Sequence, residues 1–528
     1  MLDAGGHFPH CRAMARRKAA NGPALRPLEL APERALRSEQ PHYAVVDIGS
    51  NSVRLVIYDQ LGRAPFPRFN EKSFCRLGEG LGRTGRLPAE GSRRALQALR
   101  RFRAICDAMG VTRIDVLATA AVRRAKNGGE LVAAIRKEAD LDVRILSGDE
   151  EAHHAAMGVI AGFYRPRGLV GDMGGGSLEV AEILDDRVGE RSVSLPLGSL
   201  PALALLAEGR KAAKKTIDAL LKEQLPPALT EPVFYAVGGN WRAFARAHMA
   251  HADAPVRVTH GYAIEAAAAR AFAKKLSKAS ADELAAVPGV PSRRADTLPA
   301  AALVLEHALK RLRSERVVFS ALGVREGWLY GQLPEDERYL DPLIEGAQTV
   351  GVPQARVPAF APALIRWTDG LFAGETPADK RLRVAACALS DIAWRDHVDT
   401  QAIESFRRLV QFPLIGLDHV ERVFLATTIH ARYTGSLSDA RLAPAIDLLS
   451  PALRRRAQIL GRTMLLGYRL SGSVPEILDD ARLHIGTDEV RLEVGAAARV
   501  PDSEVVGERL QRLASALGVA RTAIDVAG

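Results

Sequence analysis

The chain has 528 residues, of which 47% are hydrophobic and 25% charged, a composition ordinary for soluble globular proteins. No run approaches the roughly 20 consecutive apolar residues of a membrane helix, which excludes a chain built on such helices. The net charge of +10 suits an ordinary solvated surface or a polyanionic ligand, and does not distinguish nucleic acid, polyphosphate and nucleotides. Four widely spaced cysteines without a CxxC pair predict a reducing, cytoplasmic compartment, with no disulfide framework or structural zinc.

Residues 1–40 are rich in Arg, Ala and Pro without apolar periodicity, which predicts a disordered N-terminal extension. The first lobe then begins with two strands, 43–46 and 53–58, joined by the turn Asp47–Ser52. An amphipathic helix over 92–109 places Cys106 in the core. The further elements predicted for this lobe are a strand at 113–118, a helix at 130–139 and a strand at 142–146.

The second lobe repeats this plan. Strands 168–171 and 178–183 flank the turn Asp172–Ser177, and a third glycine turn, Gly238–Asn240, opens a helix whose amides can face an anion. The other elements predicted here are strands at 191–195, 232–237 and 316–319, a helix at 303–312 and a turn at 323–327.

Beyond residue 333 long helices rich in Ala, Leu and Arg run to about residue 470, and a short hairpin follows at 481–485 and 490–494. The predicted domains are therefore an α/β lobe I at 41–160, a second such lobe II at 161–332, a helical accessory domain at 333–470 and a small α/β segment at 471–528.

The two acid-and-glycine turns are suited to phosphate, because glycine lets backbone N–H groups close on an anion. Their acids, Asp47 and Asp172, need a divalent cation to bind phosphate. A Walker loop and a Rossmann fingerprint both require a helix after the turn, whereas strands follow here, so neither site fits. Two such turns predict a duplicated lobe with phosphate held between its halves.

Hydrolysis of a phosphoanhydride requires charge neutralisation, in-line placement and a positioned water. A cation held by Asp172 and Glu179 would supply the first two, and a glutamate at the base of the inter-lobe cleft would act as general base. Carboxylates also start helices for structural reasons alone, which we assign to Glu150. For Glu151 both interpretations stay open.

Thr119 and Arg123 follow the strand 113–118, at the sheet edge where ligands of open α/β sheets bind, although Arg123 alone would also suit a solvated surface. In the helical region Ser390 precedes Asp391, where a His-Asp metal phosphohydrolase needs histidine, so we assign no second metal site. The arginines at 454–456, 462 and 469 form a basic helix, interpreted as a solvated face or alternatively as a wall for a long polyanion.

Five motifs, in order, resemble those of the exopolyphosphatase/guanosine pentaphosphatase (Ppx/GppA) phosphatase family, over roughly residues 41–330. The resemblance implies two actin- and sugar-kinase-like (ribonuclease H-like) α/β lobes, followed by a mainly helical C-terminal domain of degenerate His-Asp type. The motifs are Asp47–Ser52, Thr119–Arg123, Ser147–Glu151, Asp172–Glu179 and Gly323–Gly327.

By motif position, Glu151 matches the family's water-activating glutamate, and Asp172 and Glu179 match its acidic metal or catalytic pair, with Asp47 as a further metal ligand. The chain departs from its relatives at Asn240, where they usually have a hydroxyl residue. The residues that match phosphate-contacting loops are Gly49, Asn51, Ser52, Thr119, Arg123, Gly174, Gly175, Gly176, Ser177 and Gly239.

The leading hypothesis is an exopolyphosphatase that uses Mg²⁺, with K⁺ as a second candidate cation, to release terminal phosphate from inorganic polyphosphate. Guanosine pentaphosphate, or both substrates, is the alternative within the same chemistry, and a kinase on the same fold is a third. A polyphosphate or alarmone sensor is the rival of another class, and an actin-like filament protein is the least favoured. We expect a cytoplasmic homodimer without membrane or nucleic-acid partners.

Overall fold

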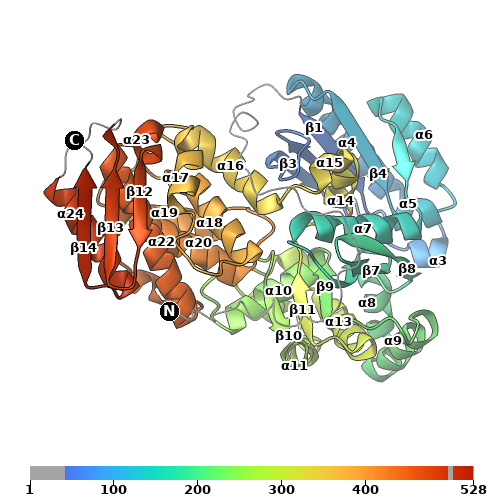
Figure 1. Cartoon of the computed structure of the whole chain (residues 1–528). Coiled ribbons are helices and arrows are strands. Elements are labelled where there is room, and N and C mark those ends of the chain that lie inside the picture. The colour runs from blue at the N-terminus through green and yellow to red at the C-terminus, as the bar shows by residue number, and fades with distance from the viewer. Residues whose placement is uncertain (1–41, 497–502, 527–528) are drawn as a thin grey trace. The chain divides into compact units, whose positions relative to one another are not determined.

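The computed structural model describes residues 42–496 and 503–526, so the predicted extension at 1–40 lies outside the described residues. The chain divides into two compact units, one ending at Arg338 and the other beginning at Tyr339. The first unit holds two α/β lobes and the second is mainly helical (Figure 1). None of the described helices is both long and apolar enough to cross a membrane.

Lobe I is built on a five-stranded sheet in the order β3-β2-β1-β4-β5, in which β1 pairs antiparallel with β2 and parallel with β4. Helix α4 begins three residues earlier than predicted, directly after Pro88, and buries Cys106 in the core as expected. The elements are β1 (Tyr43–Ile48), β2 (Val53–Tyr58), β3 (Pro67–Ser73), α3 (Leu81–Thr84), α4 (Ala89–Ala108), β4 (Arg113–Ala118), α5 (Ala120–Arg124), α6 (Gly128–Ala139) and β5 (Val143–Ile145).

Lobe II is built on a six-stranded sheet in the order β10-β11-β9-β6-β7-β8. Helix α7 (Gly148–Gly162), which falls almost wholly in the sequence range predicted for lobe I, packs on this sheet. The strands are β6 (Gly168–Met173), β7 (Leu178–Leu184), β8 (Arg187–Leu195), β9 (Val233–Val237), β10 (Ala263–Glu265) and β11 (Arg316–Phe319). The remaining helices are α8 (Ser199–Ala207), α9 (Arg210–Gln224), α10 (Gly239–His251), α11 (Ala266–Leu276), α12 (Ala281–Ala285), the 3-10 turn η1 (Ser292–Arg294), α13 (Leu298–Leu312), α14 (Val324–Gly331) and α15 (Glu335–Arg338).

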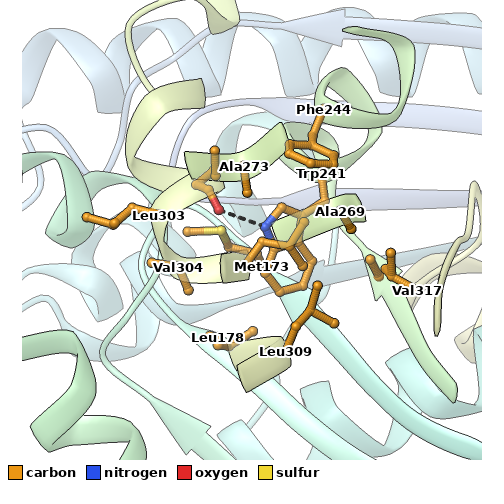
Figure 2. Close-up of a cluster of buried hydrophobic side chains, with 14 of the residues drawn as sticks. Met173, Leu178, Trp241, Phe244, Ala269, Ala273, Leu303, Val304, Leu309 and Val317 are labelled. Atoms are coloured by element: carbon orange, nitrogen blue, oxygen red, sulfur yellow. Dashed lines mark hydrogen bonds between the residues drawn. The ribbon is translucent and has the colours of Figure 1, made fainter. Parts of the chain in front are cut away.

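The core of lobe II forms between one face of this sheet and helices α10, α11 and α13 (Figure 2). Trp241 is fully buried in it, and its indole Nε1 donates a hydrogen bond to the Ala301 carbonyl oxygen at 3.0 Å. Burying the ring while its N–H is satisfied makes Trp241 a fixed point at the start of α10. The buried Trp241 therefore holds the third glycine turn, Gly238–Asn240, against the core of lobe II.

Strands β1 and β6 show that the two lobes share one plan. Both have six residues and the same burial pattern, in which every position is buried except the fifth, a partly exposed aspartate. The predicted strands stopped before these aspartates, but the ladders continue through them, because Asp47 pairs with Arg54 and Asp172 with Glu179. The turns proper are thus Gly49–Ser52 and Gly174–Ser177.

Two helices, α7 and α14, cover the faces of the sheets that bear these acids. Helix α7 packs on the sheet of lobe II through a cluster that includes Val170 and Val237. Helix α14, although it ends lobe II in sequence, packs on the sheet of lobe I through Trp328 and Leu329. Each sheet is therefore covered by a helix from the other half of the sequence.

Helix α14 corrects the prediction of a turn at 323–327. Only Gly323 precedes the helix, and the Glu326 side chain accepts a hydrogen bond from the Gly323 N–H at 3.0 Å, which caps the first turn. The glycines suggested a turn, but they allow helices α7 and α14 to cross at close range. A Cβ on Gly327 would overlap the His154 carbonyl oxygen of α7, and a Cβ on Gly158 of α7 would overlap the Gly323 carbonyl oxygen.

The second unit combines a helical bundle with a three-stranded sheet in the order β12-β13-β14, on which α24 packs. The predicted hairpin is confirmed as the antiparallel pair β12 and β13. Its elements are α16 (Pro342–Gln354), α17 (Phe360–Thr368), α18 (Pro377–Leu389), α19 (Gln401–Gln411), α20 (His419–Thr434), the 3-10 turn η2 (Ala440–Leu442), α21 (Ala443–Ile446), α22 (Pro451–Ser471), α23 (Pro475–Asp479), β12 (Ala481–Ile485), β13 (Glu489–Val494), α24 (Glu504–Leu517) and β14 (Arg521–Val526).

Candidate active site

The two acid-and-glycine turns, one from each lobe, lie against each other. A Cβ added to Gly175 would lie 2.8 Å from Cβ of Ser50, and one added to Gly176 would lie 3.3 Å from the Ser50 hydroxyl oxygen. Each turn is closed by the same backbone hydrogen bond of 3.0 Å, from Gly49 N to Ser52 O and from Gly174 N to Ser177 O. Turn residues that the sequence separates by more than 120 positions thus meet at one place.

Asp172 and Glu179 are direct cross-strand neighbours on β6 and β7 and face helix α7. The Ser194 hydroxyl, the register neighbour of Glu179 on β8, donates to the Glu179 carboxylate at 3.1 Å. Burial raises the pKa of Asp172 to about 6, and burial followed by the negative charge of Glu151 raises that of Glu179 to about 8. A cation bound here would relieve this mutual repulsion.

Glu151 lies in the first turn of α7, and only 6% of its surface is exposed. The Arg123 guanidinium donates a hydrogen bond to its carboxylate and another to the Leu146 carbonyl oxygen. Burial raises the pKa of Glu151 to about 7, although the charge of Arg123 opposes this rise. Arg123 is therefore an ion-pair partner of Glu151 and not a solvated surface arginine.

Glu150 has the structural role that its position suggested. Its carboxylate accepts from the Ser147 backbone N–H at 2.8 Å, while the Ser147 hydroxyl accepts from the Glu150 N–H at 3.1 Å, and this reciprocal pair caps α7.

Thr119 lies at the carboxyl end of β4 as predicted, and starts the short helix α5 that carries Arg123.

The third glycine turn brings Asn240 into contact with charged and polar groups of the same lobe. Gly238 has a φ of 107°, a conformation that favours glycine, and Gly239 begins α10 beside the Arg294 guanidinium. The Asn240 amide oxygen accepts from Thr297 Oγ1 at 2.9 Å and from Arg294 at 3.3 Å. The side chain that departs from the family pattern thus orients Arg294.

Sequence reasoning missed the cations around the two aspartates. Arg54 and Lys72 come from lobe I, Arg242 and Arg294 from lobe II, and Arg325 from the start of α14. Arg325 is 9% exposed and forms an ion pair with Glu326 at 3.1 Å. Burial raises the pKa of Asp47, and the positive charge of Arg325 is the largest effect that lowers it. Arg325 belongs to the motif Gly323–Gly327, but no motif marks the other four cations; strand register places Arg54 and Lys72, and the packing of α10 and η1 brings Arg242 and Arg294 to them.

The residues fit Mg²⁺ as an ion shared with substrate. Among residues 42–496 and 503–526 no group of three or more His, Cys, Asp or Glu side chains is gathered as a ready metal site. Mg²⁺ is commonly held by one or two carboxylates while substrate phosphates and water complete its shell. The buried, mutually repelling pair Asp172 and Glu179 meets that requirement, and the assignment of Asp47 as a further ligand stays a prediction.

In the helical unit Asp391 is engaged by arginines. Its carboxylate accepts two hydrogen bonds from the Arg356 guanidinium, at 2.9 and 3.0 Å, a third from the Arg356 backbone N–H at 3.0 Å, and one from Arg432 at 3.0 Å. The arginines of α22 are also largely occupied: Arg456 pairs with Glu375, and other α22 arginines bond backbone carbonyls. Arg455 and Arg469 are nevertheless exposed, so the solvated face and the polyanion wall considered for this helix both stay predictions.

Replacing Asp391 with asparagine should lower the free energy of unfolding by about 2–3 kcal/mol, because it leaves the buried guanidinium of Arg432, and the more exposed one of Arg356, without their counter-charge. The matched control is Asp479→Asn, which breaks the exposed pair with Arg366 and should cost under about 1 kcal/mol. Chemical denaturation of both variants measures the difference, and equal effects would contradict the structural role of Asp391.

Comparisons with known proteins agree with this architecture. Exopolyphosphatase 1 of Mycobacterium tuberculosis is 28% identical over 307 residues, 55% of this chain and 88% of the relative. Retrograde regulation protein 2 of Saccharomyces cerevisiae is 26% identical over 463 residues, 78% of this chain and 76% of the relative. The crystal structure of an exopolyphosphatase from Cytophaga hutchinsonii is 26% identical with a TM-score of 0.50, and the match covers 55% of this chain and 96% of that one.

The two α/β lobes expected are present, and they are followed by a mainly helical C-terminal domain. The family model for the exopolyphosphatase C-terminal domain matches residues 343–524. The model for the Ppx/GppA phosphatase family matches residues 44–336, more than half of the chain. The chain therefore belongs to the Ppx/GppA phosphatase family.

Proposed function

We propose that the protein is an exopolyphosphatase that hydrolyses the terminal phosphoanhydride of inorganic polyphosphate with the help of Mg²⁺. The observation that carries this proposal is the buried Glu151, which is held by Arg123 and whose charge repels those of Asp172 and Glu179, together with two glycine turns that lie against each other. A carboxylate with a pKa of about 7 is matched to accepting a proton from water near neutral pH.

Each group has a distinct role in the proposed reaction. The backbone N–H groups of the two glycine turns bind the oxygens of the terminal phosphate. Glu151 orients the attacking water and accepts its proton, and Arg123 keeps the carboxylate in place. Asp172 and Glu179 would hold Mg²⁺, which when bound neutralises charge on the phosphate oxygens.

The experiment that tests this function measures phosphate release by the full chain from long polyphosphate, short polyphosphate and guanosine pentaphosphate. Release from polyphosphate that requires Mg²⁺ and stops with EDTA supports the proposal. Faster release from guanosine pentaphosphate would instead favour the nucleotide substrate, which shares the same terminal phosphoanhydride. Repeating the assay with and without K⁺ tests the second cation, and the cytoplasmic homodimer stays a prediction.

A sensor with little turnover is the second candidate, because one relative that covers 78% of this chain is named as a regulation protein. In a sensor the same turns would bind phosphate without a productive water. Tight binding of polyphosphate with no phosphate release in Mg²⁺ would favour that role. The buried glutamate beside Asp172 and Glu179 argues for hydrolysis, since a binding site gains nothing from a third buried carboxylate.

Replacing Arg123 with methionine should shift the pH dependence of hydrolysis. Glu151 must be deprotonated to act as base, and the Arg123 charge lowers its pKa, so removing that charge raises the pKa above about 7. The acid limb of kcat/KM should move to higher pH. Arg100→Met, on the exposed face of α4, is the control. An unchanged midpoint in Arg123→Met would contradict the pairing.

A further inference from the structure

The glycine turn of lobe II has its first two carbonyl groups held by helix α8. The Ser199 N–H donates to the Gly174 carbonyl oxygen at 3.0 Å. The Leu200 N–H donates to the Gly175 carbonyl oxygen at 2.9 Å. A trans peptide is planar, so a carbonyl held on one side directs the following N–H group to the other side. The N–H groups of Gly175 and Gly176 therefore point away from α8, an orientation in which they can bind an anion.

The glycine turn of lobe I is held by the backbone of its own lobe, from the segment that follows β3. The Gly78 N–H donates to the Ser50 carbonyl oxygen at 2.7 Å. The Arg76 N–H donates to the Asn51 carbonyl oxygen at 3.1 Å. Asn51 is the third residue of the turn in lobe I, as Gly176 is of the turn in lobe II. In lobe I a backbone N–H of the same lobe thus holds the third carbonyl.

The third carbonyl of the lobe II turn is held by a side chain from lobe I. The Arg124 guanidinium, at the end of α5, donates to the Gly176 carbonyl oxygen at 3.3 Å. The start of α5 also approaches the turn, because a Cβ on Gly176 would lie 3.4 Å from Cβ of Ala120. By the same planarity, this hydrogen bond directs the Ser177 N–H away from Arg124. The orientation of the last N–H group of this turn therefore depends on the other lobe.

Helix α5 contacts two parts of the candidate site through two consecutive arginines. Arg123 donates to the carboxylate of Glu151, and Arg124 donates to the backbone of the turn Gly174–Ser177. Adjacent positions on a helix are rotated by about 100°, so a single turn of α5 can reach α7 with one side chain and the glycine turn with the next. The second contact supplies in lobe II the hydrogen bond that the backbone supplies at the equivalent position of lobe I.

We propose that Arg124 is a positioning residue, which holds the Gly176 carbonyl so that the Ser177 N–H faces the phosphate bound by the turn. The proposal rests on the proposed function only in naming phosphate as the anion that this turn binds. In this role Arg124 acts through the backbone of the turn and not on the substrate itself. Because Arg124 belongs to lobe I, the turn of lobe II is fully oriented only while the two lobes are in contact.

The first test is amide hydrogen exchange of the full chain without ligand, measured by mass spectrometry of its peptides. In Arg124→Met the peptide that contains Gly174–Ser177 should exchange about threefold or more faster, because the turn loses one of its hydrogen bonds. The peptide that contains Gly49–Ser52 should exchange as in the unmodified chain, since backbone bonds hold that turn. Arg93→Met, which removes an exposed ion pair with Glu90 on α4, is the matched control and should change neither peptide.

The second test is calorimetric binding of tripolyphosphate to the same proteins. Arg124→Met should weaken binding about threefold to tenfold, the effect of one hydrogen bond. Arg124→Lys, which keeps a cationic donor, should recover most of the affinity. Weaker binding in Arg124→Met with unchanged exchange of the turn would indicate direct contact with the ligand and would overturn the positioning role. Faster exchange of the turn with unchanged affinity would overturn it as well.

Activity assays separate this proposal from the proposed function. If the chain hydrolyses polyphosphate, Arg124→Met should raise KM and change kcat less, because Glu151 keeps its partner Arg123. If the chain binds tripolyphosphate in a way that depends on Arg124 but releases no phosphate, the proposed hydrolase fails and the positioning role stands. If it hydrolyses polyphosphate with both KM and exchange of the turn indifferent to Arg124, the positioning role fails and the hydrolase stands.

Discussion

Replacing Glu151 with glutamine is expected to lower kcat for polyphosphate by about 10²–10⁴-fold, the usual contribution of a general base. Glutamine keeps the length of the side chain and an oxygen that accepts from Arg123, but it cannot take a proton from water. Substrate affinity should therefore change little. Phosphate release gives kcat, and calorimetric binding of polyphosphate gives the affinity.

The neighbouring Glu150 provides the matched control for this variant. Its carboxylate caps α7 and pairs with Arg144 at 2.7 Å, on the exposed side of the same helical turn. Glu150→Gln should retain turnover and cost at most about 1 kcal/mol of stability. Full turnover in Glu151→Gln, or an equal loss in both variants, would contradict the assignment of Glu151 as base.

Replacing Gly327 with alanine should destabilise the two-lobed unit by about 4 kcal/mol or more, among the largest effects of single substitutions. A Cβ at this position overlaps the His154 carbonyl oxygen of α7, and neither backbone can move without displacing a helix from its sheet. Thermal or chemical unfolding, followed by circular dichroism, measures the loss.

Gly331, at the end of the same helix, is the matched control. A Cβ there would lie 3.4 Å from the flexible end of Met157, so Gly331→Ala should be neutral or slightly stabilising, as alanine favours helix. Similar losses from both substitutions would indicate that helix propensity, and not the crossing of α7 with α14, determines the effect.

The acid-and-glycine turns could be predicted from sequence because local chemistry determines them. A run of apolar residues, an aspartate and small residues before a second apolar run gives strand, turn and strand whichever neighbours the strands take. Capping is equally local, which is why the role of Glu150 was recognised. The prediction of a turn at 323–327 was wrong, because the sequence does not distinguish a glycine needed for contact between two helices from a glycine needed for a turn.

The cations of the site could not be predicted, because strand register is a property of the whole sheet. Nothing near Lys72 in sequence indicates that it lies in one row with Asp47 and Arg54, and Arg294 ends a short 3-10 turn far along the chain. The pairing of Arg123 with Glu151 depends in the same way on where α5 and α7 meet. Motifs identify the groups that act on phosphate, whereas packing determines their charge state.

The exchange of covering helices between the two lobes also constrains how the protein is made. The sheet of lobe I keeps one apolar face, with Tyr43, Val45 and Tyr58, until Trp328 and Leu329 arrive on α14. On the ribosome, where N-terminal parts emerge first, this face must stay uncovered until nearly all of lobe II has been synthesised. We expect the nascent chain to recruit chaperones during that interval, and a fragment that ends before α14 to aggregate.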